Sequence, residues 1–173
     1  MWDGVLHMNA APHGDHQLLQ DELRDWLKHR WARPNKARAV SQRNVARREE
    51  WPRNYRIPDI VLMPPERQHL DQGEYIAGPP LVAIEIRSPD DESYDKLPFY
   101  AQIGVPEVWI IDQRSRMVEV YALQDEGYSS IGPDEQGWIN SPATAVQMRF
   151  TDDGLLAVQM DFNLESYCEL PEN

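Results

Sequence analysis

Three short apolar runs rich in β-branched residues constrain the fold of this chain more than any other feature. They are "RIPDIVLM" (56–63), "LVAIEIRS" (81–88) and "VPEVWIID" (105–112). Runs of this length, bounded by Pro, Gly or Ser, are typical of buried or half-buried strands. "MVEVYAL" (117–123) follows the third run across "QRSR", so the two together predict a β-hairpin. The chain is therefore expected to build a sheet, and helices must cover its apolar faces.

Two segments supply those helices. "HGDHQLLQDELRDWLKHRW" (13–31) places Leu19, Leu23, Trp26 and Leu27 at helical spacing, which predicts an amphipathic helix. "DESYDKLPFYAQIG" (91–104) has an acidic start and a Gly stop, and predicts a short helix that tolerates Pro98 only near its beginning or at a kink. The segment 64–80 is interpreted as a loop, and "LLAVQMDF" (155–162) is the best strand candidate after Gly127. Strands mixed with two separated helices predict an α/β or α+β fold, in one domain spanning 1–173.

Composition limits the partners and the compartment. The 17 Lys and Arg residues against 29 Asp and Glu give a net charge of −12, so the average field repels nucleic acid. Residues 32 to 56 are nevertheless locally basic, which makes this segment a candidate substrate-facing arm. The single cysteine, Cys168, excludes an internal disulfide, and the sequence has no long apolar run. These features predict a cytoplasmic protein that does not interact with a membrane.

Acidic residues inside two of the strand runs indicate chemistry. Side chains alternate between the faces of a strand, so Asp59 shares a face with Val61, and Glu85 shares one with Arg87. Two carboxylates that face each other from neighbouring strands repel unless a cation lies between them, and Mg²⁺ or Mn²⁺ prefers such oxygen ligands. A divalent-metal site is one interpretation. The alternative is that Asp59 is a turn residue after Pro58 and that Glu85 is solvated.

Four further polar residues have a functional and a structural interpretation. Lys96, one turn before Tyr100, could orient a nucleophile, although a helix lysine is normally solvated. His16 and Glu22 lie on the first helix; the histidine is interpreted first as a packing or capping residue, and the glutamate as a surface residue. Asp112 is expected to stabilise the turn after its strand.

The ordered set "YRIPDIVL", "PLVAIEIRSP" and "DKLPFYAQIGVPEVWIID" resembles the Uma-two family of bacterial endonucleases, a branch of the PD-(D/E)XK restriction-endonuclease-like superfamily. The resemblance is densest from Tyr55 to Asp112 and extends to "HGDHQLLQDEL" in the first helix. It implies a restriction-endonuclease-like mixed β-sheet core flanked by helices. It further implies that Asp59 and Glu85 bind a divalent metal and that the reaction is phosphodiester hydrolysis.

One position departs from the superfamily pattern. A lysine usually stands two residues after the second acidic residue, and this chain has Arg87 there, which cannot act as a base. Members of this branch commonly place a lysine on the following helix, a position that Lys96 matches. The resemblance therefore gives Lys96 the role of that lysine and leaves Arg87 as a phosphate or carboxylate partner. In the mechanism that follows, the carbonyl of Ile86 adds a third ligand to Mg²⁺ or Mn²⁺.

The expected substrate is DNA, which would have to bind through a local basic cluster despite the acidic average. That cluster is Arg43, Arg47, Arg48, Arg53 and Arg56. The weak overall field leaves open that a homodimer or a partner protein is needed for binding. Two other functions stay open at this point: a noncatalytic interaction or regulatory module with the same fold, and an unrelated metal-dependent hydrolase of small phosphorylated molecules.

Overall fold

A mixed six-stranded sheet forms the centre of the molecule. The computed structural model describes residues 14–88, 92–161 and 163–172. The sheet has the order β1-β3-β5-β6-β7-β8. Its strands are β1 (Arg38–Ser41), β3 (Ile60–Met63), β5 (Val82–Ile86), β6 (Glu107–Asp112), β7 (Met117–Gln124) and β8 (Gly127–Ile131). Only β5 and β6 pair in parallel within this sheet, so the predicted mixed sheet and the predicted β6–β7 hairpin are both confirmed.

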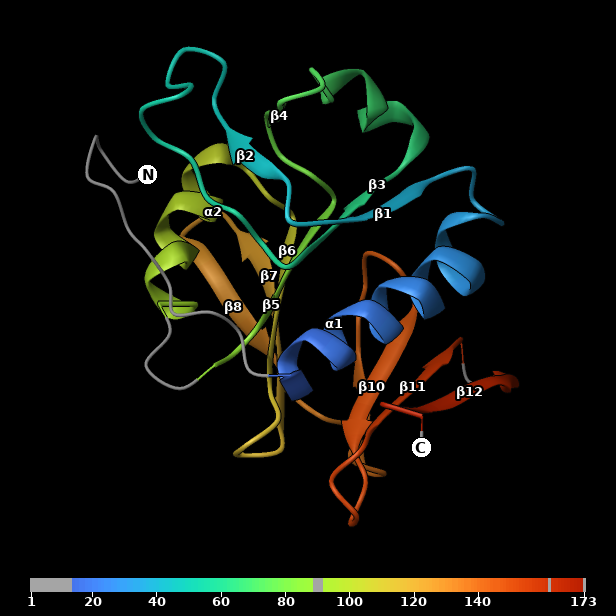
Figure 1. Cartoon of the computed structure of the whole chain (residues 1–173). Coiled ribbons are helices and arrows are strands. Elements are labelled where there is room, and N and C mark those ends of the chain that lie inside the picture. The colour runs from blue at the N-terminus through green and yellow to red at the C-terminus, as the bar shows by residue number, and fades with distance from the viewer. Residues whose placement is uncertain (1–13, 89–91, 162, 173) are drawn as a thin grey trace.

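Two helices pack against opposite faces of this sheet (Figure 1). Helix α1 (Gly14–Leu27) continues as one π-helical turn, η1 (Lys28–Ala32), and its apolar stripe meets the side of β5 that carries Val82, Ile84 and Ile86. Helix α2 (Leu97–Ile103) follows the 3₁₀ turn η3 (Tyr94–Lys96) and packs on the other side, over Ala83. Because a parallel pair needs a crossover connection, α2 links β5 to β6.

The start and end of α2 follow the sequence expectation. Pro98 lies in the first turn, where its missing N–H costs no helical hydrogen bond. Gly104 ends the helix at φ +81°, a left-handed conformation that glycine adopts without strain. No helix among the described residues is long and apolar enough to cross a membrane.

A second sheet, which the sequence pattern could not order, has the antiparallel order β12-β11-β10-β9. Its strands are β9 (Ile139–Asn140), β10 (Val146–Phe150), β11 (Leu156–Met160) and β12 (Asn163–Leu170). Their apolar side chains join α1 and the inner face of the large sheet in one core, so α1 is held between the two sheets (Figure 1). Buried Glu107 ties the sheets further, because it accepts hydrogen bonds from the Ser141 hydroxyl and the Ala143 amide.

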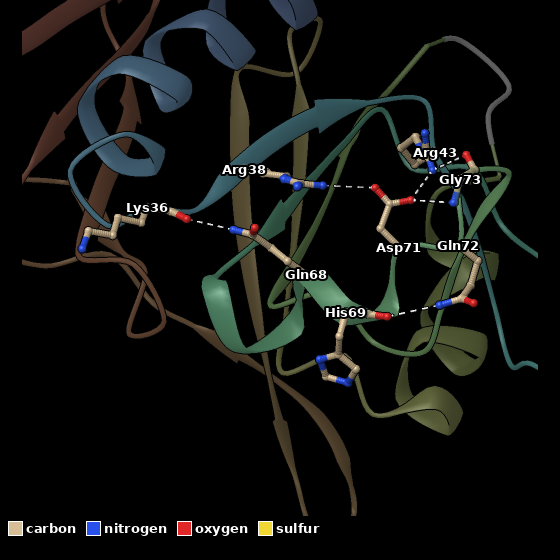
Figure 2. Close-up of polar contacts among 8 residues, drawn as sticks. All are labelled: Lys36, Arg38, Arg43, Gln68, His69, Asp71, Gln72 and Gly73. Atoms are coloured by element: carbon tan, nitrogen blue, oxygen red, sulfur yellow. Dashed lines mark hydrogen bonds and ion pairs between the residues drawn. The ribbon is translucent and has the colours of Figure 1, made fainter.

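The segment 64–80 is more ordered than the expected loop. It contains the 3₁₀ helix η2 (Pro65–Leu70) and strand β4 (Tyr75–Ala77), which pairs in parallel with β2 (Asn44–Ala46). Asp71 holds this segment to β1 and to the β1–β2 connection, since its carboxylate accepts bonds from Arg38 and Arg43 (Figure 2). The loop interpretation was wrong because β4 is three residues long and its partner strand lies 31 residues earlier in the sequence.

Candidate active site

Asp59 and Glu85 meet where β3 begins and β5 ends. Ile60 pairs with Ile84 in the antiparallel register, so Asp59, one residue before β3, lies opposite Glu85. The Asp59 carboxylate accepts a hydrogen bond of 2.7 Å from the Ile86 amide. By strand alternation both carboxylates belong to the sheet face that α2 covers, because Val61 and Ala83 pack on that side. The structure therefore brings the two predicted carboxylates together on one face.

Glu85 is buried, and each of its carboxylate oxygens accepts a hydrogen bond. The residue is 1% exposed, and its two carboxylate oxygens accept hydrogen bonds of 2.6 Å each, one from the Lys96 ammonium and one from the Tyr100 hydroxyl. Lys96 and Tyr100 stand four residues apart, so they project from the same side of the helical segment. Lys96 is itself only 7% exposed, and its predicted approach to the carboxylates from the helix after β5 is confirmed.

Burial perturbs the titration of this group. The pKa of Glu85 is raised to about 7, mainly because burial removes solvent from the carboxyl group; the Lys96 ammonium and the Tyr100 hydroxyl lower this pKa, and the nearby Asp59 carboxylate raises it. The same burial and the Glu85 charge raise the pKa of Tyr100 well above its ordinary value, so its hydroxyl stays a donor. A carboxyl group whose pKa lies near neutrality, in a site with a second carboxylate and a buried ammonium, is typical of functional sites.

His16 joins this cluster from the opposite helix. Its Nε2 donates a 2.7 Å hydrogen bond to the Ile86 carbonyl and lies 3.5 Å from the nearer Asp59 oxygen. One turn later Gln20 donates to the Asp59 carbonyl at 3.3 Å. The interpretation of His16 as a packing residue therefore misses its contacts, and Gln20 was not singled out at all. Both are polar residues on the buried face of α1, and that is the signal in the sequence that could have revealed them.

The donor atoms gathered at the end of β5 are of the kind that bind a divalent cation. His16 Nε2, Asp59 Oδ2 and the Ile86 carbonyl oxygen lie close together, and the two contacts of Nε2 are 2.7 and 3.5 Å. Neighbouring ligand atoms around Mg²⁺ at about 2.1 Å stand about 3 Å apart, which is the same range. Within the described residues no three His, Cys, Asp or Glu side chains are grouped as around an ion. Both Glu85 oxygens face Lys96 and Tyr100 instead, although each keeps a lone pair for a cation.

Comparison with known proteins adds the family. The model of the Uma2 family, described as "Putative restriction endonuclease", matches residues 1–159. The chain belongs to the Uma2 family. A solved structure, described as a putative nuclease belonging to DUF820 from Anabaena variabilis ATCC 29413, superposes with a TM-score of 0.64 at 22% identity. The match covers 82% of this chain and 79% of that one, and it confirms the mixed-sheet fold class. No curated protein matches.

In this Uma2 protein the residue at the usual lysine position does not contact the carboxylate pair. The Arg87 guanidinium donates a 2.9 Å bond to Asp112 and stacks over the Tyr94 ring at 4.9 Å. Asp112 also accepts bonds from the Arg114 and Ser115 amides, so its predicted role in the turn is confirmed. Of the two partners expected for Arg87, the structure shows a carboxylate.

The other sequence-selected residues lie outside the carboxylate cluster. Glu22 accepts a bond from the Glu172 amide near the C-terminus. Arg47 donates to Glu50 and to the Gln102 carbonyl, whereas Arg48 is exposed. The five arginines of the predicted basic cluster therefore differ in environment: Arg43 pairs with Asp71, and Arg56 is buried over the Phe99 ring.

Tyr100→Phe tests how Glu85 is held. We expect it to lower the free energy of unfolding by about 2 kcal/mol at pH 8, where the lost bond has a charged acceptor, and by about 1 kcal/mol at pH 5, where Glu85 is protonated. Urea titrations at the two pH values measure this. Tyr128→Phe is the matched control, because the Tyr128 hydroxyl donates to the neutral Val105 carbonyl and its loss costs the same at both. An equal effect of Tyr100→Phe at both pH values would contradict the assignment.

Proposed function

We propose that this protein is a metal-dependent endonuclease that hydrolyses phosphodiester bonds of DNA. The observation that carries the proposal is buried Glu85, held by Lys96 and Tyr100 beside Asp59 at one edge of the sheet. Membership of a family described as restriction endonucleases supports a nuclease function. A buried ammonium–carboxylate contact is costly to maintain for stability alone, which favours a functional reason for the cluster.

Asp59, Glu85 and the carbonyl of Ile86 would hold Mg²⁺ or Mn²⁺, with His16 as a further nitrogen donor. When bound, such a cation supplies Lewis-acid polarisation of the scissile phosphate and lowers the pKa of water. His16 Nε2 carries a proton while it donates to the Ile86 carbonyl, so ligation through this atom requires that proton to leave. Glu85 must likewise be ionised, so we expect cation affinity and activity to rise as the pH increases through about 7.

Lys96 has two tasks in this proposal. Its ammonium stabilises the ionised form of Glu85, since it opposes the pKa increase that burial causes. The same positive charge, 2.6 Å from the carboxylate, can orient an attacking water and stabilise the negative charge that develops on the phosphate oxygens. Because Lys96 and Tyr100 hold Glu85 from one helical segment, the carboxylate is preorganised before substrate binds.

A cleavage assay tests the proposal through cation dependence. We expect the purified protein to nick supercoiled plasmid or cut single-stranded DNA with Mg²⁺ or Mn²⁺, and to lose all cleavage with EDTA. The measurement is product formation on gels at several pH values between 6 and 8.5.

Two results would contradict a nuclease. Cation binding without cleavage of any nucleic acid would favour the noncatalytic module, for which Arg87 in place of lysine is the supporting observation. Turnover of small phosphodiesters with no cleavage of DNA or RNA would instead favour a small-molecule hydrolase.

A further inference from the structure

A short basic loop between β2 and β3, residues 47–56, is compact and held by hydrogen bonds. Residues 47–54 form successive hydrogen-bonded turns, in which the Glu50 and Trp51 amides both donate to the Arg47 carbonyl. The Glu50 carboxylate accepts bonds from the Arg47 guanidinium at 3.2 Å and from the Asn54 amide at 2.8 Å. The negative charge of Glu50 is therefore paired with Arg47 inside the loop. Hydrogen bonds of side chains and of the backbone hold the loop together, so its surface is preformed.

The loop is docked on the helix that carries the site. Arg47 donates a 2.6 Å bond to the Gln102 carbonyl near the end of α2, and the Arg56 guanidinium lies 4.3 Å from the centre of the Phe99 ring. Lys96 stands six residues before Gln102, which is about 9 Å along a helix. Phosphates of a strand in duplex geometry recur about every 3.4 Å along the axis, so a strand stacked in that way covers this distance in about three nucleotide steps. A strand bound at the site could thus also contact the loop.

Three aromatic side chains gather at this loop with their polar atoms toward solvent. The Trp51 ring stacks on Tyr75 of β4 with centroids 4.5 Å apart and planes 4° apart, and Tyr55 lies tilted 5.2 Å from Trp51. All three are half-buried. In the described part of the chain their indole nitrogen and two hydroxyls donate no hydrogen bond and are not buried. Tyr and Trp buried for packing alone usually have such partners, so this arrangement is typical of an interaction surface.

Exposed positive charge accompanies the aromatic side chains. Arg48 and Arg53 are exposed, and neither has an acidic partner among the described residues. Five of the 17 Lys and Arg residues lie between Arg43 and Arg56, a segment with only two acidic residues. Since the rest of the chain is strongly acidic, a polyanion would be attracted to this segment and repelled elsewhere.

We propose that loop 47–56, together with Tyr75, binds unpaired nucleotides of a nucleic-acid strand next to the active site. The aromatic cluster offers a stacking surface for bases, and Arg48 and Arg53 contact the phosphates. Bases inside a duplex are stacked on each other, so such a surface binds single strands or the unpaired part of a junction. This inference rests on the proposed nuclease function and deepens it, because it names the class of substrate.

Binding in EDTA separates this inference from cleavage. Fluorescence anisotropy would be measured with labelled 20-mers of dT and of U, and with a 20-base-pair DNA duplex, at several salt concentrations. We expect Trp51→Ala to weaken single-strand binding by about 5- to 150-fold, the effect of losing one base–aromatic stack, with an unchanged salt dependence. Arg48→Ala/Arg53→Ala should also weaken binding, and should reduce the slope of log K against log salt by about 1.4.

Matched variants control for charge and folding. Arg30→Ala/Arg33→Ala removes the same charge from exposed positions at η1 and should leave single-strand binding nearly unchanged. Trp51→Phe keeps a stacking ring and should restore most of the affinity that Trp51→Ala loses. Thermal unfolding of each variant shows whether it is folded.

Several results would overturn the inference. These are equal losses for duplex and single strand on Trp51→Ala, equal losses in the Arg30/Arg33 control, or no single-strand binding by the unaltered protein. Sedimentation showing that Trp51→Ala disrupts self-association instead would assign the surface to a second copy of this chain. If the unaltered protein binds single strands through this surface but cuts no DNA with any cation, the nuclease proposal fails and the binding surface stands.

Discussion

Asp59→Asn should reduce cation-dependent DNA cleavage by at least about a thousandfold while the protein stays folded. The substitution keeps the shape of the side chain and an oxygen that can accept the Ile86 amide bond, and it removes the negative charge. Loss of a charged cation ligand removes several kcal/mol of transition-state stabilisation, and each 1.4 kcal/mol is a factor of about ten. Initial rates on supercoiled plasmid at saturating Mg²⁺ or Mn²⁺ measure the effect.

Stability and activity should separate in this variant. The Asp59 carboxylate raises the pKa of Glu85, so its removal relieves repulsion and should leave the melting temperature in EDTA unchanged or higher. Asp125→Asn is the matched control, because Asp125 is an exposed residue of the β7–β8 turn, and it should cleave at the normal rate. Near-normal cleavage by Asp59→Asn would exclude this carboxylate from the chemistry.

Glu85→Gln should remove a large pH dependence of folding stability. The folded protein holds a proton on Glu85 up to about pH 7, whereas the unfolded chain releases it near 4.5. Between these values the unfolded state binds fewer protons, so stability falls as the pH rises. A pKa difference of this size corresponds to about 3 kcal/mol, lost between about pH 4.5 and pH 7 in the unaltered protein and not in the variant.

Urea unfolding in EDTA from pH 4.5 to 8.5 measures the difference between the two proteins. Other titrating groups cancel in this difference, and any constant offset from the amide does not affect the slope. Glu126→Gln, at an exposed turn, should reproduce the unaltered profile. Parallel stability profiles for Glu85→Gln and the unaltered protein would show that Glu85 titrates normally and that burial does not perturb it.

The sequence alone determined the strands and the position of the two carboxylates along them. The β-branched runs around Ile60–Met63 and Val82–Ile86 encode strands through local composition, and alternation assigns Asp59 and Glu85 to faces. Helical spacing then aligned Lys96 with Tyr100, and Gly104 marked the end of that helix. These features depend on neighbours a few residues apart, so periodicity and capping were sufficient to predict them.

Only the tertiary structure decided which side chains complete the cluster. His16 reaches the Ile86 carbonyl across 70 positions of sequence, and that contact depends on how α1 crosses the end of the sheet. The hydrogen-bond partners of the two Glu85 oxygens are decided by how α2 packs on the sheet. The pKa near 7 follows from the burial of the carboxyl group, and no local pattern encodes that burial.

The arginines show the same limit. Composition identified a basic segment, but packing sorted its members: Asp71 binds Arg43, the Phe99 ring covers Arg56, and Arg48 stays exposed. The strand order of the C-terminal sheet could not be predicted either, because its strands are short and their apolar faces pack against α1. Local sequence specifies the periodicity of an element, whereas the partner of each polar group is fixed only when distant elements pack and exclude water.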